Sequence, residues 1–348
     1  MLMKRLFIII GMALVIGVGI LLASSFDIAP FFSKTSRTEK IIVLTPTPMP
    51  FVEMTIPHLR ARSYVSHIGE RKRIADSGVY MSYATSYASD NLSINGLLTI
   101  PKGDMPIEGW PAIVFVHGYI PPTEYQMTKN YVSYVDYLAK KGFVVFKIDL
   151  RGHGESEGEP GGAYYSSDYV IDTLNAMAAL KTVDFVNPKR IGLWGHSMAG
   201  NIVMRSFAAH PSIPAVVIWA GAGYTYTDLA AYRISDTSYR PPTITTPRAR
   251  TRQLLRDTYG DFSATHEFWK QVAVTEYLKD LHGALELHHA VDDDVVSIEY
   301  SRNLIKLLNE TQVDHTLYEY AGGGHNISGE YFTAAMERTV EFYTKHLR

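Results

Sequence analysis

The sequence predicts an α/β fold, with a mostly parallel, eight-stranded sheet and helices on both of its faces. From residue 78 onward, short apolar runs of strand length alternate with longer helical patterns. The run at 112–116, Ala-Ile-Val-Phe-Val, is typical of a strand that is buried on both faces. Strands that alternate with helices in this way imply parallel strands joined by helical crossovers.

Each predicted element follows from its local pattern. The predicted strands cover residues 78–87, 92–101, 112–116, 143–148, 190–194, 215–219, 284–287 and 315–320. The first two form a hairpin around a turn at Ser89-Asp90-Asn91. The predicted helices between and after these strands cover residues 124–141, 167–182, 198–209 and 329–346.

One long insertion interrupts the alternation. Residues 222–280 contain no clear buried strand, but they carry prolines at 241, 242 and 247 and helical patterns at 248–259 and 265–278. A connection of this length without a strand is more typical of a small domain element than of a plain loop. We therefore expect a small helical cap over the sheet, within a domain that spans residues 59–348.

The composition excludes several classes of protein. The chain has 348 residues and a formal net charge of −2, without a block of Lys and Arg, so no nucleic-acid partner is expected. It contains no cysteine, which removes disulfides, thiolate metal sites and cysteine nucleophiles.

The N-terminus indicates export. Lys4 and Arg5 precede an unbroken apolar or glycine run at residues 6–23, which nearly spans a bilayer core of about 30 Å. The length favours an uncleaved anchor within residues 1–26; a cleaved signal peptide, with Ala23 and Ser25 at its cleavage site, is the alternative. The basic end predicts an extracytoplasmic catalytic domain, which would be secreted if the segment is cleaved.

A linker separates this segment from the domain. Residues 27–58 include prolines at 46, 48 and 50, which suit an extended spacer, and we expect low order up to about residue 60.

The strongest catalytic signal is Gly195-His196-Ser197-Met198-Ala199-Gly200. It follows an apolar strand and precedes a helix, which is the context of a nucleophile elbow. The serine must adopt a strained backbone conformation there, and small neighbours leave room for it. Ala199 stands where the consensus has glycine. The pattern predicts Ser197 as a nucleophile.

A serine nucleophile needs a base and an orienting acid, which follow it in the chain order of this motif. His325, in a glycine-rich loop after the strand at 315–320, is the late histidine that fits the base. Asp293 is our choice for the acid, and its neighbours Asp292 and Asp294 remain alternatives. The backbone N–H groups of Met198 and Tyr119 are the expected oxyanion donors.

Other polar residues suggest supporting roles. Arg151 and His153 lie ahead of the nucleophile and are expected to buttress the loops around the site. His288 and His289 precede the three aspartates, but adjacent histidines rarely point the same way, so we expect no metal.

Together, these motifs resemble the catalytic domain of the prolyl oligopeptidase family, which includes acylaminoacyl-peptidase-like hydrolases. The matching pieces are Asn95-Gly96-Leu97-Leu98 with Pro101, Phe115-Val116-His117-Gly118, Asp149 with Arg151-Gly152-His153-Gly154, the segment 195–200, Asp293 and His325. The resemblance covers the chain from about residue 80 and implies an α/β-hydrolase fold, no cofactor, and cleavage of peptide or ester bonds through an acyl-enzyme.

Two departures bear on the substrate. Large members of that family carry a β-propeller, for which the roughly 20 residues ahead of the first strands leave no room. Gly-His-Ser-Met is also a form found in esterases and lipases. The aromatic residues of the insertion include Tyr224, Tyr226, Tyr232, Tyr239 and Trp269, and it shows no obvious charged anchor for a peptide terminus.

The leading functional hypothesis is a serine hydrolase that acts on a peptide or an acylated amino acid outside the cytoplasm. A carboxylesterase acting on small acyl esters is the alternative. A membrane-tethered binding protein without catalysis is a remote third hypothesis, because a fold alone does not imply an activity.

Overall fold

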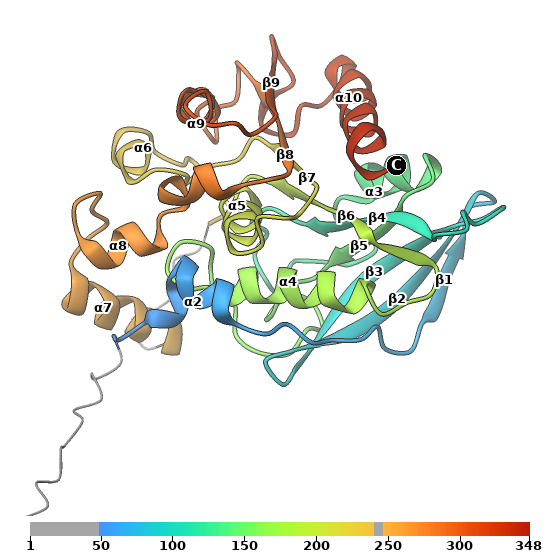
Figure 1. The fold of residues 1–348 in the computed structure, drawn as a ribbon, viewed down its shortest axis with the longest axis horizontal. Coiled ribbons are helices and arrows are strands. Elements are labelled where there is room, and N and C mark those ends of the chain that lie inside the picture. The colour runs from blue at the N-terminus through green and yellow to red at the C-terminus, as the bar shows by residue number, and fades with distance from the viewer. Residues whose placement is uncertain (1–48, 240–245) are drawn as a thin grey trace, which may run out of the picture. The chain divides into compact units, whose positions relative to one another are not determined.

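A computed structural model of the chain describes residues 49–239 and 246–348. These residues contain a nine-stranded mixed sheet in the order β1-β2-β3-β5-β4-β6-β7-β8-β9 (Figure 1). The strands are β1 (Lys72–Asp76), β2 (Tyr80–Ser89), β3 (Leu92–Pro101), β4 (Trp110–Val116), β5 (Val144–Ile148), β6 (Val186–His196), β7 (Ala215–Trp219), β8 (Ala284–Ala290) and β9 (His315–Tyr320). Strands β5 to β9 together with β4 pair in parallel, and β1, β2 and β3 form an antiparallel edge.

Helices cover both faces of this sheet. The helical elements are η1 (Val52–Met54), α2 (Ile56–Ala61), α3 (Val132–Lys140), α4 (Asp168–Leu180), α5 (Ala199–Ala209), α6 (Tyr226–Ala231), α7 (Pro247–Tyr259), α8 (Glu267–Val272), η2 (Val274–Asp280), α9 (Glu299–Leu308), η3 (Gly324–Asn326) and α10 (Glu330–Leu347). Helices α4 and α5 share one hydrophobic core with the sheet, and α3 and α10 share a second core. The predicted mostly parallel α/β architecture is confirmed.

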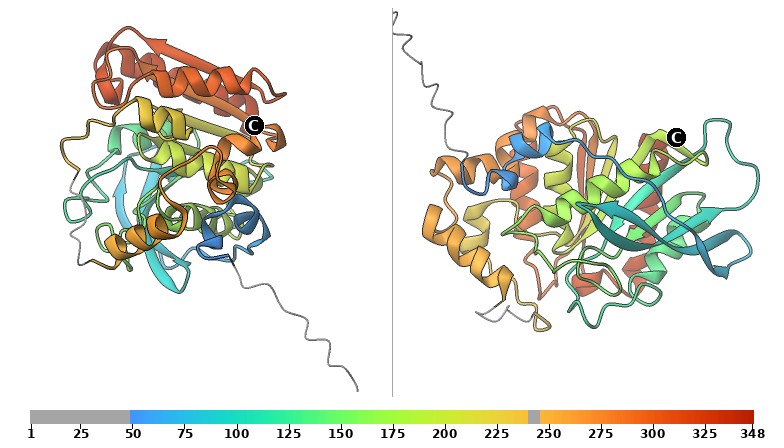
Figure 2. Two further views of the ribbon diagram at one scale, coloured as in Figure 1. Left: turned by 90° about the vertical axis from the view of Figure 1, so that its left-hand side faces the viewer. Right: turned by 90° about the horizontal axis from the view of Figure 1, so that it is seen from below.

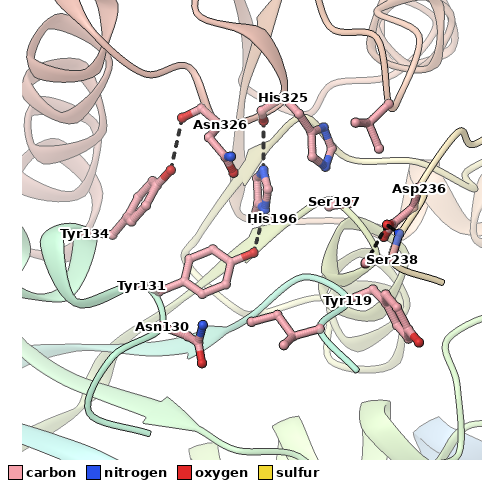
Figure 3. A pocket seen from close by; sticks show the side chains of 12 residues that line it. Tyr119, Asn130, Tyr131, Tyr134, His196, Ser197, Asp236, Ser238, His325 and Asn326 are labelled. Atoms are coloured by element: carbon pink, nitrogen blue, oxygen red, sulfur yellow. Dashed lines mark hydrogen bonds between the residues drawn. The ribbon is translucent and has the colours of Figure 1, made fainter. Parts of the chain in front are cut away.

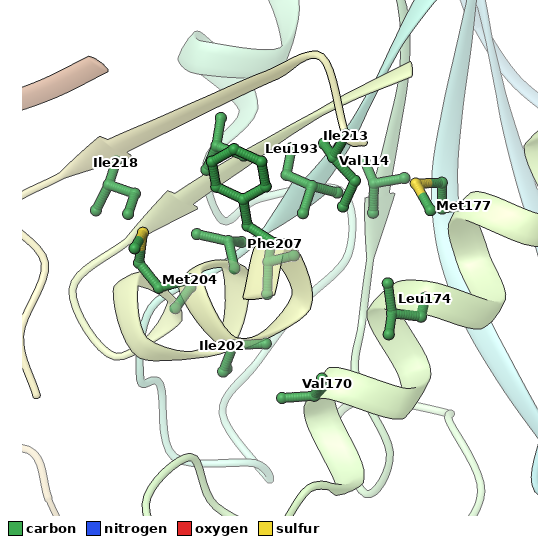
Figure 4. Packing of buried hydrophobic residues seen from close by; sticks show 14 of the residues in the cluster. Val114, Val170, Leu174, Met177, Leu193, Ile202, Met204, Phe207, Ile213 and Ile218 are labelled. Carbon is green, nitrogen blue, oxygen red and sulfur yellow. The ribbon is translucent and has the colours of Figure 1, made fainter. Parts of the chain in front are cut away.

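The central strands form because their residues are apolar on both faces. All residues of β5 and β7 are buried, as expected for parallel strands between two helical layers. Figure 4 shows one of these layers, where Phe207 and Met204 of α5 and Leu174 of α4 pack towards Leu193 and Val114 of the sheet.

The sheet has one strand more than the predicted eight. Strand β1 pairs antiparallel with β2 and is exposed along its whole length. Lys72, Arg73 and Asp76 give this strand three charges in five residues. An edge strand without a buried face has no apolar pattern, so the sequence carried no strand signal there.

Helix α2 crosses the predicted boundary between linker and domain at residues 58 and 59. Its first three residues lie in the expected linker, and Ile56 and Leu59 are fully buried in the larger core. The Thr55 side chain accepts a hydrogen bond from the His58 N–H and caps the helix, and Pro57 occupies a first-turn position that proline favours. The folded domain therefore includes the segment from about residue 51.

The predicted helix at 124–141 is shorter than expected, because α3 begins only at Val132. The Lys147 ammonium donates to the carbonyl oxygens of Met127 (2.5 Å) and Asn130 (2.6 Å), so a buried cation binds these carbonyls in place of helical N–H groups.

The insertion between β7 and β8 is helical, as predicted. Its described residues contain α6, α7, α8 and η2. The pattern at 265–278 is divided at Ala273 into α8 and η2, and α6 and α9 were not expected. Figure 1 and Figure 2 show α7 and α8 at the opposite side of the domain from β1 to β3.

The predicted membrane segment at 1–26 and linker residues 27–48 lie outside the described residues. None of the helices in residues 49–239 and 246–348 has the length and apolar character needed to cross a membrane.

Candidate active site

Ser197 occupies a sharp turn between β6 and α5. Its φ of 55° is in the left-handed region, which is unfavourable for a residue with a side chain. A Cβ atom at Gly195 would lie 2.9 Å from the Ala199 carbonyl oxygen, so this turn requires glycine two residues before the serine. The Ser197 N–H donates to the Trp219 carbonyl on the neighbouring strand at 2.9 Å. The sequence thus places a strained serine at the carboxyl edge of the sheet.

Asp293 is the one of the three adjacent aspartates that meets His325. Its Oδ2 lies 2.8 Å from His325 Nδ1, and its side chain is fully buried. Asp292 is exposed and accepts a hydrogen bond from the Gly324 N–H at 2.8 Å, and Asp294 is exposed.

The surroundings of Asp293 keep it ionised. Burial by itself would raise the pKa of this carboxyl, but hydrogen bonds from His289 and His325 outweigh it and hold the pKa well below its usual range. The N–H groups of Val295 and Val296 both donate to Oδ1 at 2.9 Å. Asp293 is therefore a fixed negative charge on the Nδ1 side of His325.

His325 lies on the short helix η3 in the loop after β9. Gly323 and Gly324 have φ values of 107° and 59°, which glycine adopts readily, and these turns direct the loop back over the sheet. The His325 side chain is 15% exposed, so it is accessible at the pocket.

Ser197 and His325 line the same cavity, whose volume is about 490 Å³ (Figure 3). Tyr131, Tyr134 and His196 line it on one side, and Asp236 and Ser238 from the insertion lie on the other. The cavity thus brings together a serine, an imidazole with a buried carboxylate behind it, and a space that can hold a substrate, which are the groups that nucleophilic catalysis uses.

Of the two expected oxyanion donors, Met198 follows Ser197 in the chain and Tyr119 lines the same cavity. Met198 is the N-cap residue of α5, so its N–H has no acceptor within the helix. Tyr119, in the loop after β4, lines the cavity. The N–H of the preceding Gly118 is engaged by the Tyr131 hydroxyl at 3.0 Å.

A match to a protein-family model accompanies this geometry. The model described as "Serine aminopeptidase, S33" matches residues 111–331, which is more than half of the chain. The chain belongs to the serine aminopeptidase family S33. As a member of this family with the α/β-hydrolase fold, it is a serine hydrolase.

Relatives of this S33 family member include esterases and peptidases. It is 26% identical over 256 residues to Esterase YjfP of Escherichia coli (strain K12), covering 71% of this chain and 92% of the esterase. It is 26% identical to the uncharacterized peptidase YuxL of Bacillus subtilis (strain 168) over 71% of this chain, but over only 35% of the peptidase.

Solved structures show the same fold. The acylaminoacyl peptidase of Pyrococcus horikoshii matches with a TM-score of 0.61 and 20% identity, over 79% of this chain and 44% of that chain. Acetyl xylan esterase 1 of Thermoanaerobacterium sp. JW/SL YS485 matches with a TM-score of 0.56 and 18% identity, over 83% of this chain and 91% of that chain. The family and the fold thus leave the choice between peptide and ester open.

Neither Arg151 nor His153, the predicted supporting residues of this S33 family member, is among the described residues that line the cavity. Arg151 donates to both carboxylate oxygens of the fully buried Asp172. His288 and His289 face different partners, because His288 contacts Glu286 and Tyr320 whereas His289 contacts Ser301 and Asp293. Neighbouring residues of a strand alternate between faces, which explains this divergence.

Sequence reasoning missed three residues at the site. His289 was noticed but not assigned to the acid, although a histidine four residues before Asp293 was a usable signal. Asp236 is a charged group in the insertion, where no charged anchor was expected. Tyr131 carried no signal, because a tyrosine next to a helix is common and its role depends on tertiary contacts.

Proposed function

We propose that this chain cleaves peptide or acyl-amino-acid bonds through an acyl-enzyme, with Ser197 as nucleophile, His325 as base and Asp293 as the orienting acid. The observation that carries the proposal is the 2.8 Å contact between His325 Nδ1 and the buried Asp293, in the same cavity as Ser197. An acceptor on Nδ1 keeps a proton there and leaves Nε2 as the basic nitrogen.

The chemistry follows from these roles. His325 Nε2 takes the Ser197 hydroxyl proton as the serine oxygen attacks the substrate carbonyl. The Met198 and Tyr119 N–H groups stabilise the oxyanion, and Asp293 stabilises the imidazolium of His325. The imidazolium then gives its proton to the leaving group, and a water molecule, activated in the same way, hydrolyses the acyl-enzyme.

Asp236 supports a substrate with a positive charge. It is the only carboxylate among the described residues that line the cavity, and none of those residues is Lys or Arg. The Ser238 N–H (2.8 Å) and hydroxyl (2.6 Å) both donate to Asp236 Oδ1, which holds the carboxylate in place and leaves Oδ2 to accept from a ligand. The free amino end of a peptide would complement this charge.

A matched pair of substrates tests this proposal. Alanine p-nitroanilide and isobutyryl p-nitroanilide differ only in an ammonium group in place of a methyl group. We expect the wild-type chain to favour the alanine substrate in kcat/KM, and Asp236→Asn to reduce that preference about tenfold, which corresponds to about 1.4 kcal/mol for a partly solvated charge pair.

The control is Asp261→Asn, which removes an exposed carboxylate of the same insertion outside the cavity. It should leave the preference unchanged. An Asp236→Asn variant with the wild-type preference would contradict the proposed recognition of an amine.

A carboxylesterase acting on small acyl esters is the second candidate. The E. coli esterase is matched over 92% of its length, whereas the B. subtilis peptidase is matched over 35%. p-Nitrophenyl isobutyrate has the acyl group of the neutral anilide with a better leaving group. Turnover of this ester without turnover of either anilide would favour the esterase.

For localisation, we propose that residues 6–23 hold the chain in a membrane with the catalytic domain outside the cytoplasm, on the basis of their apolar run and the preceding Lys4 and Arg5. The expected result is a full-length chain that resists alkaline extraction from membranes and is digested by protease added outside spheroplasts. A chain found in the soluble fraction within the cells would contradict this.

A further inference from the structure

A continuous line of hydrogen bonds joins three loops around Ser197, and Figure 3 shows the part of it that runs from Tyr131 through His196 to His325. The Gly118 N–H, in the loop after β4, lies 3.0 Å from the Tyr131 hydroxyl. That hydroxyl lies 2.7 Å from His196 Nδ1, and His196 Nε2 lies 2.9 Å from the His325 carbonyl oxygen. The line therefore runs from the expected oxyanion loop, past the residue before Ser197, to the backbone of His325.

The direction of every proton in this line is determined. Burial lowers the pKa of His196 to about 3, so its ring is neutral and carries one N–H at neutral pH. The His325 carbonyl can only accept, so the His196 proton is on Nε2 and Nδ1 is an acceptor. The Tyr131 hydroxyl donates to Nδ1, and its oxygen accepts from the Gly118 N–H.

We propose that Tyr131 and His196 are positioning residues that set the His325 loop and the oxyanion loop against Ser197 at the same time. This inference rests on the catalytic roles of Ser197 and His325 proposed above. Tyr131 and His196 do not react themselves, and they act through the backbone of the residues that do.

Three further observations support this role. Tyr134, one turn along α3 from Tyr131, donates to the Asn326 carbonyl at 3.0 Å, so the same helix holds the His325 loop at a second point. The rings of His196 and His325 lie 4.6 Å apart between centroids. A Cβ atom at Gly118 would lie 2.6 Å from the Tyr131 hydroxyl, so the oxyanion loop approaches this residue as closely as a glycine allows.

The line also constrains the oxyanion loop. Because the Gly118 N–H already donates to Tyr131, it is not available to an oxyanion, and the loop is fixed in the conformation in which Tyr119 lines the cavity. His196 stays neutral when His325 is protonated, because a nearby positive charge disfavours a second one. The His196 donor to the His325 carbonyl therefore persists through the catalytic cycle.

The test uses full-length Tyr131→Phe and His196→Phe variants and a neutral p-nitrophenyl ester. Displacing a catalytic group by about 1 Å can cost about 100-fold in rate. We expect each variant to lower kcat about 10- to 100-fold with KM within about threefold. The double variant should be no slower than the slower single variant, because both changes break one line.

Two controls separate positioning from general damage. His196→Gln keeps a side-chain N–H within reach of the His325 carbonyl, and it should recover most of the activity that His196→Phe loses. Tyr137→Phe removes a hydroxyl from the same helix at a residue that does not line the cavity, and it should match the wild type.

The outcomes are distinguishable from a failure of the proposed catalytic roles. Tyr131→Phe and His196→Phe activities within twofold of the wild type would overturn the positioning role, and so would additive losses without rescue by His196→Gln. An active Ser197→Ala variant would instead overturn the catalytic roles on which the inference rests.

Discussion

The two walls of the pocket are held in different ways. On the wall formed by the strand ends, His196 is 2% exposed, and its hydrogen bonds reach residues that are 65 and 129 positions away in the chain. On the wall formed by the insertion, Asp236 and Ser238 are half-buried and bond to each other across two positions. The first wall is rigid because the core fixes it, whereas the second is a local structure.

This difference separates reaction from recognition. The sheet fixes the groups that react, and a separate insertion supplies the contacts to the substrate, as is common when function lies on loops over a rigid scaffold. Changes to the strand-end wall should therefore lower kcat, and changes to the insertion should alter substrate preference.

The largest expected effect comes from the acidic loop after β8. Asp293→Asn should lower kcat about 10³- to 10⁴-fold, because the neutral amide no longer holds the imidazole in the required tautomer. The matched controls are Asp292→Asn, which weakens one hydrogen bond to Gly324, and Asp294→Asn. Each should keep kcat within about tenfold of the wild type. Kinetics with one ester substrate compare all three. A larger loss at Asp292 or Asp294 than at Asp293 would contradict the assignment of the acid.

The insertion should be separable from the rest of the fold. Leu255, Phe268 and Trp269 form a hydrophobic cluster with Met54 that is distinct from the two main cores. Trp269→Ala should cost about 3–5 kcal/mol of stability, because it leaves a cavity in a small core.

Amide hydrogen exchange shows which part of the Trp269→Ala variant loses stability, because exchange is faster where the fold opens more often. The exchange rate should increase mainly in α7 and α8. In steady-state kinetics of the same variant, KM should rise more than kcat falls. Phe207→Ala, in the core between α5 and the sheet, should instead destabilise the whole domain. Faster exchange throughout the domain in Trp269→Ala would show that the two regions are not independent.

The pH dependence of stability should report the buried state of His196. Because burial lowers its folded pKa to about 3, below the unfolded value of about 6.5, only the unfolded chain binds this proton between those values. This histidine therefore lowers stability as pH falls below about 6.5. Between pH 6 and pH 4, the free energy of unfolding measured in urea should fall less steeply for His196→Gln than for the wild type. The two slopes should differ by about 1.4 kcal/mol per pH unit. Equal slopes would show that His196 is protonated in the folded chain.

The sequence predicted the elements whose burial creates a pattern. Strands such as β4 and β5 are apolar throughout, and the turn at Ser197 has a motif. Strand β1 was missed because an exposed edge has no apolar face, and α2 was missed because it begins within the proline-containing segment that resembled a linker. Burial depends on tertiary contacts, so the residues of these two segments do not by themselves reveal what each segment packs against.

The site was predictable to the same extent. The elbow motif predicted Ser197, and chain order and loop position predicted His325. The three adjacent aspartates were equivalent in composition and differ only in which side chain is buried against the imidazole. Tyr131 and Asp236 could not be found, because each reaches the cavity from a segment with no catalytic motif.

The most direct test of the account is covalent labelling of the full-length chain with a fluorophosphonate, followed by intact mass and peptide mapping. The account predicts one adduct per chain, located on Ser197, no adduct in Ser197→Ala, and strongly slowed labelling in His325→Ala. A folded wild-type chain that takes up no label, or a Ser197→Ala variant that is labelled as fast as the wild type, would contradict it.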